Sequence, residues 1–126
     1  MLGNHPITPV LLATDLAAAR EFYHGKLGLQ IERGNDNAIV FRCGSGTHLD
    51  VTKSTVGTAD QQTQAAWQVS DIRAEVAELR ARGVKIEDYD TPGLTTKDGI
   101  ADIGFAWAAW ITDPAANTLG ILQIKK

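Results

Sequence analysis

The chain has 126 residues, enough for one domain of ordinary size. It carries 12 Lys and Arg against 15 Asp and Glu, and the cations are scattered, so nucleic acid is not an expected partner. No apolar run approaches the roughly 18 residues of a membrane-spanning helix, and no membrane partner is expected. The single cysteine, Cys43, excludes an internal disulfide, and with no signal-like start a cytoplasmic location is the expectation.

The first half of the chain predicts a strand, a helix and three further strands. The opening strand is expected over residues 7–13. Asp15 is placed to cap a helix whose apolar residues recur at helical spacing up to the stop signal at Gly28. Alternating strand-like runs follow at residues 29–33, 38–43 and 48–53.

The second half repeats this order after a polar linker over residues 55–62. A strand is expected over residues 64–69, and Asp71 is placed to cap a helix that stops at Gly83. The same cap, helix length and stop glycine in both halves indicate an internal duplication. The remaining predicted strands cover residues 84–89, 103–112 and 119–125.

We therefore predict an α+β fold of two tandem βαβββ modules within one domain, residues 1–126. Module one covers about residues 5–54 and module two about residues 63–125. Each sheet would have one face covered by its helix. The two uncovered faces would then line a trough, which is a natural place for a small-molecule ligand.

Three motifs resemble those of the vicinal-oxygen-chelate (VOC) superfamily, the glyoxalase/bleomycin-resistance protein/dioxygenase type. Residues 15–28 resemble its opening helix, residues 69–72 the start of its second helix, and residues 113–117 the "D-P-D-G-N" hairpin before its last strand. The resemblance covers nearly the whole chain. It implies a curved mixed sheet around a central cavity, and a homodimer. The superfamily includes metal-dependent enzymes and non-catalytic drug-sequestering proteins.

The resemblance also implies where a metal ion would be bound. Its four ligand positions fall on Thr8, Asp50, Gln64 and Gly120. Gly120 has no side chain, and Thr8 offers only a neutral hydroxyl. Two oxygen donors are too few for a tight metal site, which usually has three or four protein ligands. We therefore expect no metal and no other cofactor.

His48, Asp50 and Thr52 alternate along one strand and should share the face that points into the trough. Leu49 and Val51 should face the helix. Three interpretations stay open for the polar face. It can be structural, as a hydrated surface or a His–Asp hydrogen bond, or it can be part of a non-standard metal site, or a source of acid–base catalysis.

Trp107 and Trp110 are three residues apart, so a regular strand directs them to opposite faces. We predict that Trp110 enters the trough, unless a bulge changes the register and exchanges the two. Trp67 is expected to pack under the second helix. A purely structural role for all three indoles is an equal alternative, since large aromatic residues dominate protein cores.

These observations favour a metal-free protein that binds a small molecule, sequestering an antibiotic or another planar metabolite. No catalytic residue is assigned. The alternative is a glyoxalase-like or dioxygenase-like lyase, isomerase or oxidoreductase that uses a non-standard divalent-metal site or His48 and Asp50 as acid and base. A third hypothesis is a regulatory domain with a vestigial trough. The proposed ligand-binding residues are Thr8, His48, Asp50, Gln64, Trp107 and Trp110.

Overall fold

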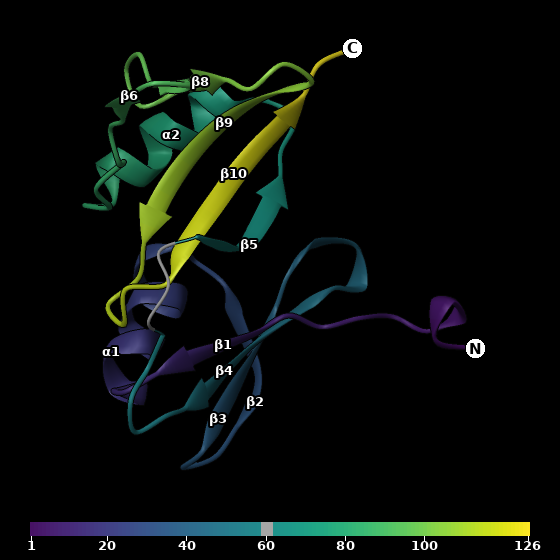
Figure 1. The fold of residues 1–126 in the computed structure, drawn as a ribbon. Helices are drawn as coiled ribbons and strands as arrows, with labels where there is room; N and C mark the ends of the chain where they lie inside the picture. The colour runs from purple at the N-terminus through teal and green to yellow at the C-terminus, as the bar shows by residue number, and fades with distance from the viewer. Residues whose placement is uncertain (59–61) are drawn as a thin grey trace. The chain divides into compact units, whose positions relative to one another are not determined.

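The computed structural model describes residues 1–58 and 62–126 (Figure 1). Residues 59–61 of the predicted linker lie outside the described residues. The chain forms two compact units, one of Met1–Asp60 with Pro114–Asn117 and one of Gln61–Asp113 with Thr118–Lys126. None of the helices described is both long enough and apolar enough to cross a membrane.

The first unit contains a four-stranded mixed sheet in the order β1-β4-β3-β2. Strand β1 runs parallel to β4, and the other neighbours are antiparallel. Its elements are η1 (Leu2–Asn4), β1 (Val10–Ala13), α1 (Leu16–Arg20), the π-helical η2 (Glu21–Lys26), β2 (Gln30–Gly34), β3 (Ala38–Arg42), η3 (Gly44–Gly46) and β4 (His48–Lys53).

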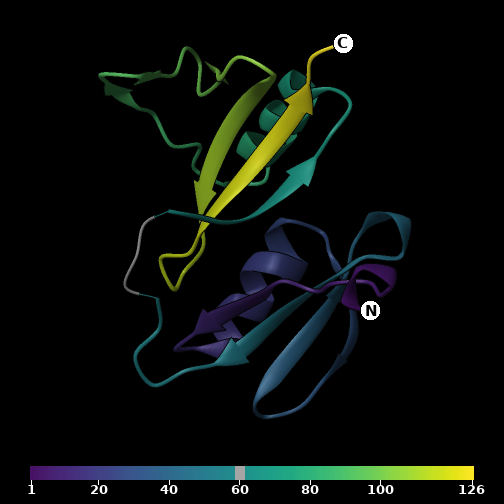
Figure 2. The ribbon, with the colours of Figure 1, turned by 45° about the vertical axis from the view of Figure 1, so that its right-hand side comes forward.

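The second unit contains a four-stranded sheet in the order β5-β10-β9-β8, with β5 parallel to β10. The helix α2 lies along one face of this sheet (Figures 1 and 2). A small hairpin, β6-β7, follows the helix. The elements are β5 (Thr63–Gln68), α2 (Ile72–Ala81), β6 (Asp90–Thr91), β7 (Leu94–Thr95), β8 (Ala101–Asp102), β9 (Ala106–Thr112) and β10 (Thr118–Ile124).

Both predicted helix caps are present, and the predicted mixed α+β class is confirmed. The carboxylate of Asp15 accepts a hydrogen bond from the backbone N–H of Ala18, and that of Asp71 accepts one from Ala74. Gly28 and Gly83 end the helical segments with φ of 76° and 81°, a conformation that favours glycine.

The two helical segments differ in one respect that the repeat did not predict. The first is one residue longer between its aspartate and its glycine, at positions 15 and 28 against 71 and 83. The structure accommodates the extra residue in η2, where Leu27 N–H bonds to the carbonyl of Phe22 five residues back. A π-helical turn is the usual way for a helix to accommodate one inserted residue.

The predicted strand over residues 84–89 is wrong. Val84 and Ile86 are buried and the intervening residues are more exposed, so the alternation is present. However, the segment makes one backbone hydrogen bond to β9, from Glu87 N–H to the carbonyl of Trp110, and no ladder. The sheet position is taken by β8, which lies within a stretch expected to be a loop. Likewise, the predicted strand over residues 103–112 begins only at Ala106.

Each unit has its own apolar core between its sheet and its helix. In the first, Tyr23 is fully buried, with its ring 5.4 Å from that of Phe41 in β3. In the second, Ile72 and Val76 of α2 are 2% exposed, and the strand residues on the same side are equally buried. Those strand residues are Ala109, Ile111, Leu119 and Ile121.

The tip of the β9–β10 hairpin packs in the first unit through Asn117, which has no exposed surface. Its amide donates to the carbonyl of Leu12, and its side-chain oxygen accepts from Thr58. The preceding residue, Ala116, has φ of 68°. In the family motif that residues 113–117 resemble, this position is a glycine. Alanine is strained in this left-handed conformation.

Exchanging Ala116 for glycine should therefore raise the free energy of unfolding by up to about 1 kcal/mol, because it relieves this strain. Urea denaturation measures the change. Ala115→Gly is the matched control, since Ala115 is not among the residues with positive φ. The control should lower stability. An equal loss of stability in both variants would contradict the assignment of strain to Ala116.

Candidate functional site

The polar face of module one lies on β4, opposite α1. Leu49 and Val51 are 2% and 0% exposed and point toward the helix, as predicted. His48, Asp50 and Thr52 alternate with them and are half-buried on the other face. The sequence therefore predicted the orientation of this strand.

Asp50 is the unusual residue on this face. Its neighbours across the sheet are Val10 in β1 and Val40 in β3, so apolar side chains flank the carboxylate. The Oδ1 atom is buried, and it has no hydrogen-bond partner among the described residues. A buried carboxylate oxygen without a donor is unfavourable. The folded chain thus keeps an acceptor in place that its own structure does not satisfy.

A charged row borders Asp50 on the same face. Arg42 in β3 pairs in register with His48, and its Nε donates to Glu32 at 2.7 Å. This hydrogen bond, together with the positive charge of Arg42, lowers the pKa of Glu32. The guanidinium of Arg42 is thus paired with Glu32.

Thr8, the first candidate residue, lies before the sheet begins. The opening strand starts at Val10, and Thr8 is exposed. The reason is Pro9, which has no N–H to donate to a ladder; its carbonyl instead accepts from the N–H of Asp50. The placement of Thr8 on the opening strand was therefore wrong.

In module two, Trp110 lies on the sheet face opposite α2. Its indole N–H donates to the hydroxyl of Thr63 at 3.2 Å, and its ring stands edge-on to Tyr89 with 5.4 Å between centroids. Burial, and secondarily the charge of Glu87, raises the pKa of the Tyr89 phenol. Two fixed aromatic rings and a neutral phenol can hold a flat ligand by stacking and hydrogen bonding.

Trp107 lies on the other face of the same strand. Strands β9 and β10 pair without a register shift, so Trp107 and Trp110 alternate as predicted. Trp107 faces the α2 side, where it lines a hollow with Ile72 of the helix. Trp107 is thus the one of the two candidate tryptophans that does not share a sheet face with Trp110. Trp67 pairs with Ile121 and shares the α2 side.

The side chains at the four implied metal positions do not fit a metal ion. Thr8 is off the strand, and Gln64 is a half-buried amide in β5 beside the register shift at Thr118 and Leu119. At Gly120, a Cβ would lie 3.3 Å from Ala66 Cβ and from Thr63 Cγ2, so this strand position is also crowded. Asp50 is left as the one anionic donor of the four.

Other residues do not replace these ligands within the described part of the chain. Across residues 1–58 and 62–126, no group of three His, Cys, Asp or Glu side chains is arranged to hold a metal ion. The chemistry of these donors therefore gives no support to a tight divalent-metal site.

Comparison with known proteins places this architecture in a family. The model of the Glyoxalase/Bleomycin resistance protein/Dioxygenase superfamily matches residues 5–121, and the chain belongs to this superfamily. A search of curated proteins found no match.

Solved structures with the same fold include proteins of different function. The bleomycin-binding protein from Streptomyces verticillus, complexed with copper(II)-bleomycin, is 24% identical with a TM-score of 0.71, covering 96% of this chain and 97% of that one. An antibiotic binding protein from a Streptomyces species is 19% identical with a TM-score of 0.69, covering 96% of each chain. Lactoylglutathione lyase from Agrobacterium tumefaciens is 22% identical with a TM-score of 0.65, covering 94% of this chain and 92% of that one.

Sequence reasoning missed Tyr89 as the partner of Trp110. Tyr89 lies at the end of the extended segment that was assigned to a strand. It reaches Trp110 only because Glu87 bonds to the Trp110 carbonyl and holds this segment along β9. No local motif marks such a contact between residues 21 positions apart.

Replacing Asp50 with valine should raise the free energy of unfolding by about 1 kcal/mol, since it removes an unsatisfied buried acceptor between two valines. Thr52→Val, on the same strand and face, controls for the strand preference of valine and should give a smaller gain. Urea denaturation of both variants measures the difference. A less stable Asp50→Val variant would show that the carboxylate has a stabilising partner.

Proposed function

We propose that this protein binds a small planar organic molecule without a metal ion, and that the uncovered sheet face of each module is a candidate surface for it. The observation that carries the proposal is the buried, unpartnered Oδ1 of Asp50. Natural proteins keep such groups mainly where function requires them, at the expense of stability. A ligand N–H, O–H or ammonium group would supply the missing donor.

The aromatic pair in module two supports the planar character of the ligand. Trp110 and Tyr89 hold each other edge-on, and Thr63 fixes the indole N–H. Rings that are already oriented lose little conformational entropy when a ligand stacks on them. An antibiotic is the first ligand class to test, because two proteins of this fold are antibiotic-binding proteins.

The donor chemistry at the four positions supports the proposal of a metal-free site. Asp50 contributes a carboxylate, Gln64 a neutral amide, Thr8 a hydroxyl, and Gly120 nothing. Such a set does not match the three or four strong ligands of a metal-dependent member of the superfamily. The proposed recognition therefore depends on hydrogen bonding and stacking.

Purified protein treated with a chelator should retain no stoichiometric zinc, nickel, manganese or iron(II) after incubation and desalting. Its melting temperature should not rise with any of these ions. Metal analysis and a thermal-shift titration measure both quantities. Retention of one equivalent, lost again in Asp50→Asn, would reverse the proposal and favour a metal-dependent enzyme.

A ligand on the aromatic face of module two should quench the fluorescence of Trp110, and a ligand on the polar face of module one should owe most of its affinity to Asp50. Metal-free bleomycin and copper(II)-bleomycin are the first probes, followed by a panel of planar antibiotics. For a probe that binds, Asp50→Asn should weaken binding about tenfold or more, the usual effect of losing a hydrogen bond to a charged group. Trp110→Phe should abolish most of the quenching.

Two variants serve as controls for this experiment. Asp36→Asn removes an exposed carboxylate from the β2–β3 loop, and Trp67→Phe removes an indole on the α2 side. Both should bind the probe as the wild type does. Full affinity in both Asp50→Asn and Trp110→Phe would refute both candidate surfaces, and conversion of a probe to product would favour an enzyme.

A further inference from the structure

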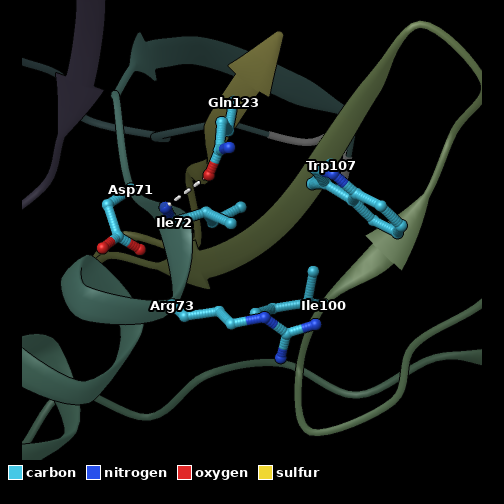
Figure 3. A pocket seen from close by; sticks show the side chains of 6 residues that line it. All are labelled: Asp71, Ile72, Arg73, Ile100, Trp107 and Gln123. Carbon is cyan, nitrogen blue, oxygen red and sulfur yellow. Dashed lines mark hydrogen bonds between the residues drawn. The ribbon is translucent and has the colours of Figure 1, made fainter. Parts of the chain in front are cut away.

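A separate hollow of about 230 Å³ lies at the start of α2, on the sheet face that the helix covers (Figure 3). It belongs entirely to the second unit, and Trp110 points to the opposite face of the same sheet. The residues that line it are Asp71, Ile72, Arg73, Ile100, Trp107 and Gln123.

Part of the wall of this hollow is formed by buried apolar residues and an indole. Ile72 and Ile100 are 2% and 8% exposed. The indole of Trp107 forms a flat wall, and the ammonium of Lys125 lies 4.2 Å from its ring centroid. Lys125 is in turn bound by Asp102 at 2.6 Å, so the indole has a fixed neighbour. A rigid aromatic wall of this kind suits a flat ring.

The polar groups of the hollow include hydrogen-bond donors that have no partner among the described residues. Gln123 accepts the N–H of Ile72 through its side-chain oxygen at 2.8 Å, which orients the amide and leaves its Nε2 protons without a partner among the described residues. The amide and the helix start lie together in Figure 3. The remaining donor protons can therefore be offered to a ligand.

The charges at the hollow also favour a ligand that carries a hydrogen-bond acceptor. The guanidinium of Arg73 has no ion-pair or hydrogen-bond partner in residues 1–58 or 62–126. Asp71 is the acid nearby, but its carboxylate turns toward α2 and accepts the N–H of Ala74 at 3.2 Å (Figure 3). The acidic group is thus used by the helix, whereas the basic group is free.

We propose that this hollow is a second binding site, for a small planar carboxylate. The ring of the ligand lies against Trp107 and Ile100, and its carboxylate receives hydrogen bonds from Arg73 and from the Gln123 amide. The planar guanidinium matches a carboxylate in geometry and in charge. The volume is below the roughly 300–1,000 Å³ of sites for drug-sized ligands, so one or two fused rings fit.

The test titrates the full chain with indole-3-carboxylate and with benzoate at low salt. Binding is monitored by ¹H–¹⁵N NMR. Both should shift the indole N–H of Trp107 and the side-chain amide of Gln123. Arg73→Gln should weaken binding at least tenfold, and indole-3-carboxamide should bind the wild type at least tenfold more weakly than the acid. Glutamine keeps the helix propensity of the exposed position, so the variant should fold.

Arg20→Gln is the matched control, because it removes the same charge from an exposed position on α1 in the other unit. It should leave the affinity unchanged. The proposal would be overturned if Arg73→Gln bound the probes with unchanged affinity. It would also be overturned if the NMR shifts were confined to Trp110, or if no binding were seen at millimolar concentrations of the probe. Asp50→Asn should bind these carboxylates normally, so the outcome here is separate from that of the proposed function.

Discussion

Each module depends on the burial of one sheet face beneath a single helix. In module one, Tyr23 packs against Phe41. In module two, Ile72 and Val76 of the helix and the residues of β9 and β10 that face it are buried together. Because one face carries this burial, the opposite face of a central strand can hold polar or aromatic side chains. This division is what allows Asp50 and Trp110 to occupy central strands without disturbing the core of their own module.

Core packing does not explain why Asp50 and Trp110 occupy their positions. An antibiotic-binding protein and a lyase both share this fold, so the fold alone does not separate binding from catalysis. The residues at the implied metal positions are one carboxylate, one amide, one hydroxyl and a glycine, a donor set that gives no support to a tight divalent-metal site. The carboxylate of Asp50 lies between two valines and has one oxygen without a hydrogen-bond partner among the described residues.

The two modules have diverged while keeping the same architecture. Module one accommodates an extra helical residue in a π-helical turn, whereas α2 ends after regular α-helix. Module two replaces its first post-helical strand with an extended segment and a small hairpin. That difference brings Tyr89 to Trp110 and Ile100 to the hollow beside Trp107. The divergent segments thus supply the aromatic and apolar surfaces of module two.

The sequence by itself determined the helix caps, the stop glycines and the alternation of β4, because these are set by neighbours within a few residues. It also predicted the opposite directions of Trp107 and Trp110. Only the tertiary structure decided which extended segments form ladders, since residues 84–89 alternate correctly yet find no partner strand. It alone showed that the Oδ1 atom of Asp50 has no donor among the described residues and that Arg73, Trp107 and Gln123 line one hollow, because such facts depend on residues distant in the chain.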